Sequence, residues 1–254
     1  MPKRAFQVLL AACLVSGRLW AADDPFVGKW KLNPSKSKLT DTMKVELSGA
    51  NKYTLDLGGG TPETVVADGT DQLAPDGTTL CITVEGPDTW RVVRKKDGRT
   101  LLTAIWKLSK DGNTLRDALT ANQPNGSTFS LDYVYKRTAG SAGFPGTWES
   151  TSEEVNSVFE IEIRPYEGDG LSLVIPAQNS TKNMRFDGKD YPNQVPGSAS
   201  TARRVNERTL EMTDKKNGKI SSTQQIKVSP DLKTLTIVQS VGQSKPSILV
   251  FDRE

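Results

Sequence analysis

The sequence contains no histidine in its 254 residues. Ser-His-Asp and Cys-His catalytic arrangements, histidine general bases and histidine-ligated zinc sites all require an imidazole, so the sequence excludes them. No other catalytic constellation is recognisable along the chain. We therefore expect no enzymatic activity, no metal site and no cofactor.

Cysteine is scarce, with only Cys13 and Cys81 in the chain. Cys13 lies in an N-terminal segment that we expect to be removed, so the mature chain forms no intrachain disulfide. Cys81 lies between Leu80 and Ile82, and without a histidine partner we interpret it as a small buried apolar residue rather than a nucleophile. The folded units must then be large enough to be stable without covalent links.

The chain also lacks a hydrophobic run that is long enough to span a membrane. A membrane-spanning helix needs about 20 apolar residues, and the apolar segment Ala5–Val15 is far shorter. We therefore expect that the chain is not an integral membrane protein. This segment follows the basic start Met1–Arg4 and precedes small residues at Ala21-Ala22. That order is typical of a secretory signal peptide over residues 1–21, and it predicts a secreted or periplasmic protein.

The same segment has a second interpretation. The run from Leu10 to Cys13 resembles the bacterial lipobox, in which the cysteine is lipidated and becomes the new N-terminus. The apolar run before Cys13 is short and continues through Leu14-Val15, which favours cleavage after Ala21. A lipoprotein anchored through Cys13 remains the alternative.

The chain has no basic excess once the leader is set aside. Its formal charge of +3 comes from 33 Lys and Arg against 30 Asp and Glu. Removal of Lys3, Arg4 and Arg18 leaves 30 of each sign. Nucleic-acid binding needs a basic face that displaces counterions from phosphates, so we expect no nucleic-acid partner.

The body of the chain is an internal repeat. The motif Phe26–Trp30 recurs 118 residues later as Phe144–Trp148, and further collinear matches follow to the end of both copies. The repeating unit is about 115 residues long. We predict one unit over residues 26–137, a second over 144–254, and a flexible linker of small residues over 138–143.

Each copy has the pattern of an all-β unit. Short runs of β-branched and aromatic residues alternate with Gly, Asp and Pro, at the spacing of about 8–12 residues that is typical of barrels and sandwiches. Asp97-Gly98 and Asn217-Gly218 are tight-hairpin dipeptides. We predict two tandem antiparallel barrels of about eight or nine strands each.

Barrel closure pairs a first strand with a last strand, which makes specific residues meet. Trp30 opens the first copy and Arg137 closes it, while Trp148 and Arg253 occupy these places in the second copy. We predict that each arginine stacks on the tryptophan of its own copy, in a structural role.

The segment Phe26–Leu32 resembles the opening strand of the calycins, in which lipocalins share a Gly-x-Trp motif. Val134–Arg137 is similar to their closing strand. The resemblance implies a lipocalin-like barrel with an apolar-lined cup, as in secreted bacterial proteins. Fatty-acid-binding proteins place a carboxylate-binding Arg where this chain has Tyr133, so a fatty acid is not implied.

These observations favour a non-catalytic module that binds a small or apolar ligand in a barrel. Trp90 aligns with Thr209 of the second copy, so the two repeats do not share a tryptophan in their cores at this position. Trp90 is therefore a candidate ligand contact, together with Tyr133 and Tyr135. The alternative is a structural or partner-binding envelope protein whose barrels are filled by side chains. A hydrolase or isomerase that uses cavity carboxylates is the third hypothesis.

Overall fold

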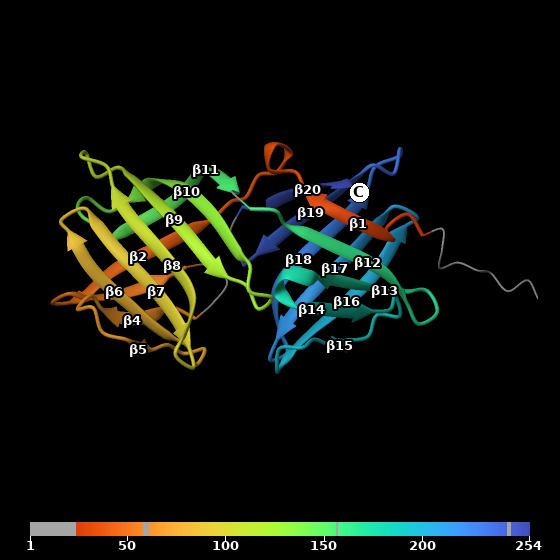
Figure 1. Cartoon of the computed structure of the whole chain (residues 1–254), viewed down its shortest axis with the longest axis horizontal. Helices are drawn as coiled ribbons and strands as arrows, with labels where there is room; N and C mark the ends of the chain where they lie inside the picture. Colours follow the sequence, from red (N-terminus) through yellow and green to blue (C-terminus); the bar gives the residue numbers. More distant parts are fainter. Residues whose placement is uncertain (1–23, 58–60, 156, 243–244) are drawn as a thin grey trace, which may run out of the picture.

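The computed structural model describes residues 24–57, 61–155, 157–242 and 245–254. The predicted signal peptide and the lipobox cysteine Cys13 lie outside these ranges. The described chain is all-β and forms two antiparallel sheets of ten strands each, which curl into two nearly closed barrels side by side (Figure 1). The predicted tandem barrels are confirmed, with more strands per barrel than expected. No helix in the described ranges is long and apolar enough to cross a membrane.

Barrel 1 is the sheet with the strand order β4-β3-β2-β11-β10-β9-β8-β7-β6-β5. Its strands are β2 (Thr42–Gly49), β3 (Lys52–Asp56), β4 (Glu63–Val66), β5 (Gln72–Leu73), β6 (Thr79–Gly86), β7 (Thr89–Lys96), β8 (Arg99–Leu108), β9 (Thr114–Asn122), β10 (Thr128–Ala139) and β11 (Gly146–Val155). Among the described residues its two end strands, β4 and β5, do not pair with each other, which leaves a seam in the barrel.

Barrel 2 has the order β14-β13-β12-β1-β20-β19-β18-β17-β16-β15, with its seam between β14 and β15. Its strands are β1 (Gly28–Leu32), β12 (Glu160–Tyr166), β13 (Gly170–Ile175), β14 (Ser180–Met184), β15 (Tyr191–Pro192), β16 (Ser198–Asn206), β17 (Thr209–Lys216), β18 (Lys219–Val228), β19 (Thr234–Val241) and β20 (Ser247–Arg253). Two short 3-10 helices, η1 (Pro34–Lys36) and η2 (Pro176–Gln178), follow β1 and β13.

The predicted hairpin turns form where the sequence places them. Asp97 and Gly98 have φ angles of 49° and 76°, and Asn217 and Gly218 repeat these values at 49° and 76°. Positive φ at both central residues matches the right-handed twist of the flanking strands. These turns connect β7 to β8 in barrel 1 and β17 to β18 in barrel 2.

The opening strands of the two repeats are exchanged. β1 comes from the first repeat but lies between β12 and β20 of the second, and β11 lies between β2 and β10 of the first. Each barrel thus takes its opening strand from the other repeat, so neither 26–137 nor 144–254 forms a barrel by itself. The prediction that Trp30 meets Arg137 and that Trp148 meets Arg253 is wrong, because the exchange gives each tryptophan the other arginine.

The exchange also changes the role of the predicted linker. Residues 138–143 do not connect the barrels, because β10 and β11 pair with each other and this segment lies at their turn. The chain passes between the barrels from β1 to β2 through residues 33–41, and from β11 to β12 after Val155. The barrels are therefore joined by two crossing connections.

The exchanged strands anchor both cores. Trp30 and Trp148 are both 0% exposed. The indole N–H of Trp30 donates to the main-chain oxygen of Phe26 at 2.9 Å, and that of Trp148 donates to Phe144 at 3.0 Å. The repeated Phe-x-Gly-x-Trp segment thus buries both of its aromatic side chains in the core of a barrel and links them by a local hydrogen bond.

Candidate functional site

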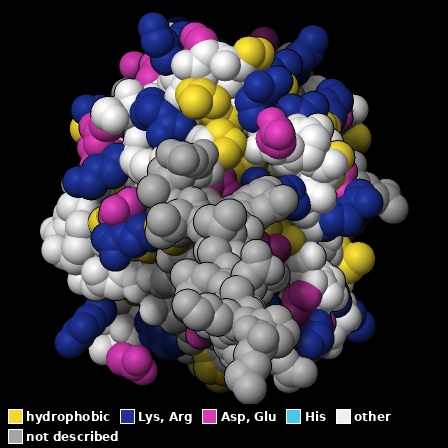
Figure 2. Space-filling model, turned by 90° about the vertical axis from the view of Figure 1, so that its right-hand side faces the viewer, with side chains coloured by type: hydrophobic (Ala, Val, Ile, Leu, Met, Phe, Trp, Pro, Cys, Tyr) yellow, Lys and Arg dark blue, Asp and Glu magenta, His cyan; other side chains and the backbone are white. Residues whose placement is uncertain are grey.

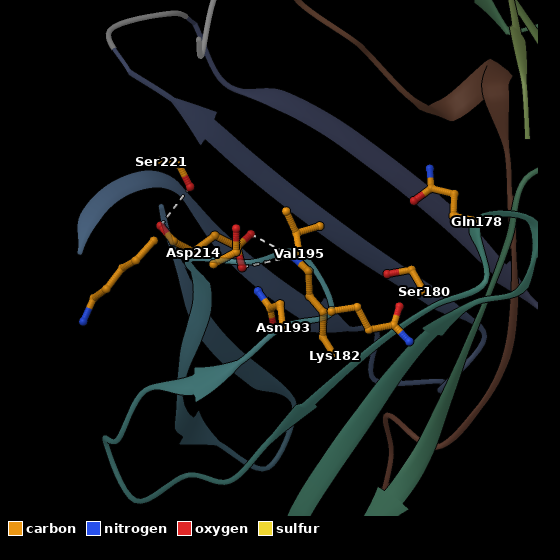
Figure 3. Close-up of a pocket in the computed structure, with 10 residues that line it drawn as sticks. Gln178, Ser180, Lys182, Asn193, Val195, Asp214 and Ser221 are labelled. Atoms are coloured by element: carbon orange, nitrogen blue, oxygen red, sulfur yellow. Dashed lines mark hydrogen bonds and ion pairs between the residues drawn. The ribbon is translucent and has the colours of Figure 1, made fainter. Parts of the chain in front are cut away.

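A pocket of about 390 Å³ lies in barrel 2 at the seam between β14 and β15. Figure 3 shows side chains from η2, from β14, from the segment after β15 and from β17 around it. Apart from Val195 the lining is polar, and its main members are Gln178, Ser180, Lys182, Asn193, Ser198 and Asp214. This composition suits a ligand that is recognised by hydrogen bonds.

Asp214 of β17 lines this pocket and is the centre of a polar network. Lys182 of β14 donates to both of its carboxylate oxygens at 3.0 Å. The hydroxyls of Ser200 and Ser222 also donate to it, and the amide of Gln224 does so at 3.3 Å. Both charges of the ion pair are mostly buried, with side-chain exposures of 23% for Lys182 and 14% for Asp214. A buried pair needs such additional hydrogen bonds to offset its desolvation.

The charges that border the pocket are paired with one another. Lys215, which lines the pocket, lies 2.7 Å from Asp190 in a second ion pair. Asn193 donates to the hydroxyl of Ser200 at 3.0 Å, which holds that fully buried serine in place. The formal charges therefore cancel, and the hydrogen-bonding capacity left for a ligand is that of neutral amides and hydroxyls.

Barrel 1 carries the same ion pair with its charges reversed. Glu63 on β4 and Arg94 on β7 hold the strand positions that Lys182 and Asp214 hold on β14 and β17. Arg94 donates to the two carboxylate oxygens of Glu63 at 2.6 and 3.1 Å, and to the hydroxyl of Thr78 at 2.7 Å. In both barrels an ion pair crosses the barrel near the seam.

The positions around this ion pair differ between the barrels. Leu80 and Leu102, which pair with Arg94 across the ladder, correspond to Ser200 and Ser222, which pair with Asp214. Ala104 likewise corresponds to Gln224. Both serines are buried and donate to Asp214, so they belong to its polar network. The two barrels thus have one framework but different interiors.

Aromatic side chains fill the middle of barrel 1. Trp90 is 3% exposed and stacks on Phe144 with ring centroids 3.9 Å apart, and it also contacts Tyr53 and Trp106. The strand register aligns Trp90 with the buried Leu210 rather than with Thr209. The alignment that made Trp90 a ligand candidate is therefore wrong, and Trp90 occupies a core position that both repeats share.

Barrel 1 also buries an acidic side chain opposite a tryptophan. Asp117 of β9 pairs across the ladder with Trp106 of β8 and is 7% exposed. Within the described residues, Asp117 Oδ1 and Trp106 Nε1 have no hydrogen-bond partner. Burial raises the pKa of Asp117 to about 7. Barrel 2 has Ile226 and Ile237 at these positions, so its core buries no carboxyl group there.

The other two candidate residues lie near this buried acid, away from the pocket. Tyr135 is 2% exposed and donates its hydroxyl to Asp41 at 2.5 Å. Tyr133 is half-buried, with its ring 5.5 Å from that of Tyr135. Burial raises the pKa of both tyrosines, and the nearby Asp41 carboxylate raises it further, so both hydroxyls stay protonated. A ligand-binding role for these two residues stays a prediction.

The sequence patterns did not identify the residues that line the pocket. Glu63 and Lys182 occupy equivalent positions with opposite charge, as do Arg94 and Asp214, and this reciprocal change was the available signal. Within the described ranges, no group of three or more Cys, Asp or Glu side chains could hold a metal ion. Comparison with protein-family models, with curated proteins and with solved structures finds no match for this chain.

Proposed function

We propose that this protein is a non-catalytic binding module that holds a small polar ligand in the pocket of barrel 2. The observation that carries the proposal is the pocket itself, which is lined by neutral amides and hydroxyls around the ion pair of Lys182 and Asp214. A few polar groups placed in a cavity fix the orientation of a bound ligand. The cavity of about 390 Å³ lies within the range of small-molecule sites.

The polarity of the pocket favours a polar ligand over the apolar one that the lipocalin resemblance implies. The two charges cancel within each of its ion pairs, Lys182–Asp214 and Lys215–Asp190. A ligand with a net charge would leave one of these groups without its partner and lose the corresponding stabilisation. We infer a neutral ligand rich in hydrogen-bonding groups.

We propose further that the protein acts outside the cytoplasm. The basic start, the apolar run and the small residues over residues 1–21 support this location. Figure 2 shows basic and acidic side chains interspersed over the visible end face. That mixed surface suits a protein that does not bind a large body of one charge.

A structural role is the second candidate, and barrel 1 favours it. Trp90, Trp106 and Phe144 fill its interior, so this barrel resembles a packed scaffold. In the structural alternative both barrels serve as a rigid envelope component and the pocket of barrel 2 holds only water. The two readings differ in whether barrel 2 retains a ligand.

Native mass spectrometry of the protein purified from its own cell envelope tests the proposal. We expect a small non-covalent adduct on the wild-type protein and none on the Ser180→Leu variant, which places a larger side chain in the pocket lining. Thr61→Leu, a matched change at the equivalent position of barrel 1, should keep the adduct. An adduct that survives in Ser180→Leu would place the ligand elsewhere, and a wild-type protein without any adduct would favour the structural role.

A further inference from the structure

A second cavity, of about 210 Å³, lies where the two barrels meet. Figure 1 shows the chain passing from β1 to β2 at this junction. The polar part of the lining comes from the end of this connection and from barrel 2, and consists of Thr40, Asp41, Gln239, Lys245 and Ser247. No residue lines both this cavity and the pocket at the seam of barrel 2, so the two are separate.

The internal repeat supplies a second junction for comparison, where the chain passes from β11 to β12. The strand registers show that four polar residues of the cavity stand where the other junction has apolar ones: Asp41, Gln239, Lys245 and Ser247 correspond to Phe159, Leu119, Phe129 and Leu131. At that other junction the rings of Phe129 and Phe159 pack edge to face, with centroids 6.0 Å apart. One junction is thus an apolar contact, and the other is a cavity with polar walls.

Asp41 is an acidic group of this wall without a cationic partner. Its carboxylate accepts from the hydroxyl of Tyr135 at 2.5 Å. Among the described residues no lysine or arginine forms an ion pair with it, and burial raises its pKa. Lys245 does not supply the missing charge, because its ammonium group is bound to Glu149 at 2.8 Å. A partly buried carboxylate without a cation is costly, and a cation brought by a ligand would offset that cost.

Gln239 provides a second contact for a ligand. Within the described ranges its side-chain amide has no hydrogen-bond partner. The hydroxyls of Thr40 and Ser247 are engaged, since they donate to the main-chain oxygens of Lys245 and Thr40. One carboxylate and one amide are too few oxygen ligands for a calcium or magnesium ion, and they match an ammonium group that carries a further hydrogen-bonding group.

We propose that this cavity is a second ligand site, which binds a small primary amine with its ammonium group on Asp41 and a hydrogen-bonding group on Gln239. The site goes beyond the function proposed above, because it lies in another cavity and takes a cation rather than a neutral ligand. The volume of about 210 Å³ corresponds to roughly seven water molecules at about 30 Å³ each, so the ligand is small.

Titration of the ¹⁵N-labelled mature chain with 5-aminopentan-1-ol tests the proposal. This probe carries an ammonium group and a hydroxyl, and we expect saturable shifts in the amide resonances of Asp41, Gln239 and Ser247. Pentane-1,5-diol has the same length without the charge and should cause none at the same concentration. Equal shifts with both probes, or no shifts with either, would overturn the proposal. Shifts of Ser180 alone would assign the amine to the seam pocket and would also overturn it.

Two variants separate the charge from the shape of the cavity. Asp41→Asn keeps an acceptor for Tyr135 but removes the charge, and should weaken amine binding at least about tenfold. Asp169→Asn removes the same charge from an exposed turn and should bind as the wild type does. Gln239→Leu introduces the residue of the other junction and should also weaken binding, which keeps the test decisive if Asp41→Asn does not fold. Wild-type affinity in either cavity variant would overturn the site.

Discussion

Arg137 lies over the indole of Trp148, with its guanidinium carbon 4.1 Å from the ring centroid, although the two residues belong to different repeats. Arg253 lies in the same way over Trp30, at 4.0 Å. The glycine two residues before each tryptophan leaves room for the guanidinium to lie over the indole. A Cβ on Gly146 would lie 2.6 Å from Arg137 Nη1. The Gly-x-Trp motif and the closing arginine therefore form one unit across the exchanged strands.

This relationship predicts which barrel depends on which tryptophan. Trp148→Ala should lower the free energy of unfolding of barrel 1 by about 3–5 kcal/mol, because a fully buried indole is removed from its core. Protection from hydrogen exchange should fall in β2–β10 and stay nearly unchanged in β12–β20. Mass spectrometry of exchanged peptides resolves the two sets.

Trp30→Ala is the matched control, and it should reverse the pattern. If Trp148→Ala instead lowered protection in β12–β20, each repeat would keep its own opening strand and the exchange would be refuted. Arg137→Ala should cost less than Trp148→Ala, since a cation over an indole contributes about 0.5–2 kcal/mol.

The reversed ion pairs predict a rescue between the two seams. Lys182→Glu should destabilise barrel 2 by about 2–4 kcal/mol, because it leaves Asp214 beside a second acid in a mostly buried site. Adding Asp214→Arg should recover more than half of the loss, since the Glu63–Arg94 pair has this arrangement. A double-mutant cycle in urea measures the coupling.

The control for this cycle is an exposed pair of the same barrel. Lys189 is 79% exposed and lies 3.8 Å from Asp187. Lys189→Glu should change stability by less than about 1 kcal/mol. An equally large loss there would show that the effect of Lys182→Glu reflects net charge rather than the buried pair.

The buried Asp117 predicts that barrel 1 loses stability as the pH rises. Its pKa is raised from 3.8 to about 7, so between about pH 4 and 7 the folded protein holds a proton that the unfolded chain releases. The slope should approach about 1.4 kcal/mol per pH unit within this window. Urea titrations at pH 5 and pH 7.5, followed by tryptophan fluorescence, measure the difference.

Asp117→Asn should remove most of this difference between the two pH values. Asp117→Ile, which is the residue of barrel 2 at this position, should also raise stability at pH 7.5. Asp41 and Glu153 have pKa values raised by burial as well, so a smaller slope of the same sign should remain in both variants. An unchanged slope in both variants would mean that Asp117 is ionised throughout.

The N-terminal segment predicts the mass of the exported protein. Cleavage after Ala21 should leave Ala22 as the first residue, and intact-mass measurement of protein from the extracellular or periplasmic fraction checks this. A lipid-modified Cys13 at the N-terminus would establish the lipoprotein alternative instead. Retention of Met1–Arg4 would contradict both forms of processing.

Much of the architecture could be predicted from the sequence because it depends on local patterns. The Asn217-Gly218 dipeptide favours a hairpin, and the repeated Phe-x-Gly-x-Trp segments mark two equivalent opening strands. The polar pocket could not be predicted in the same way. Asp214 and Lys182 are 32 residues apart, and only the curvature of the sheet brings them across the barrel to each other.

The sequence by itself determined that the chain is a duplicated all-β protein without histidine chemistry. It could not determine which barrel each opening strand enters, because β1 and β11 carry the same Gly-x-Trp motif and both repeats end in the same kind of arginine. Only the tertiary structure, in which the chain crosses between the barrels after Leu32 and after Val155, decided the exchange. It alone also decided which interior packs around tryptophan and which holds serines around a buried ion pair.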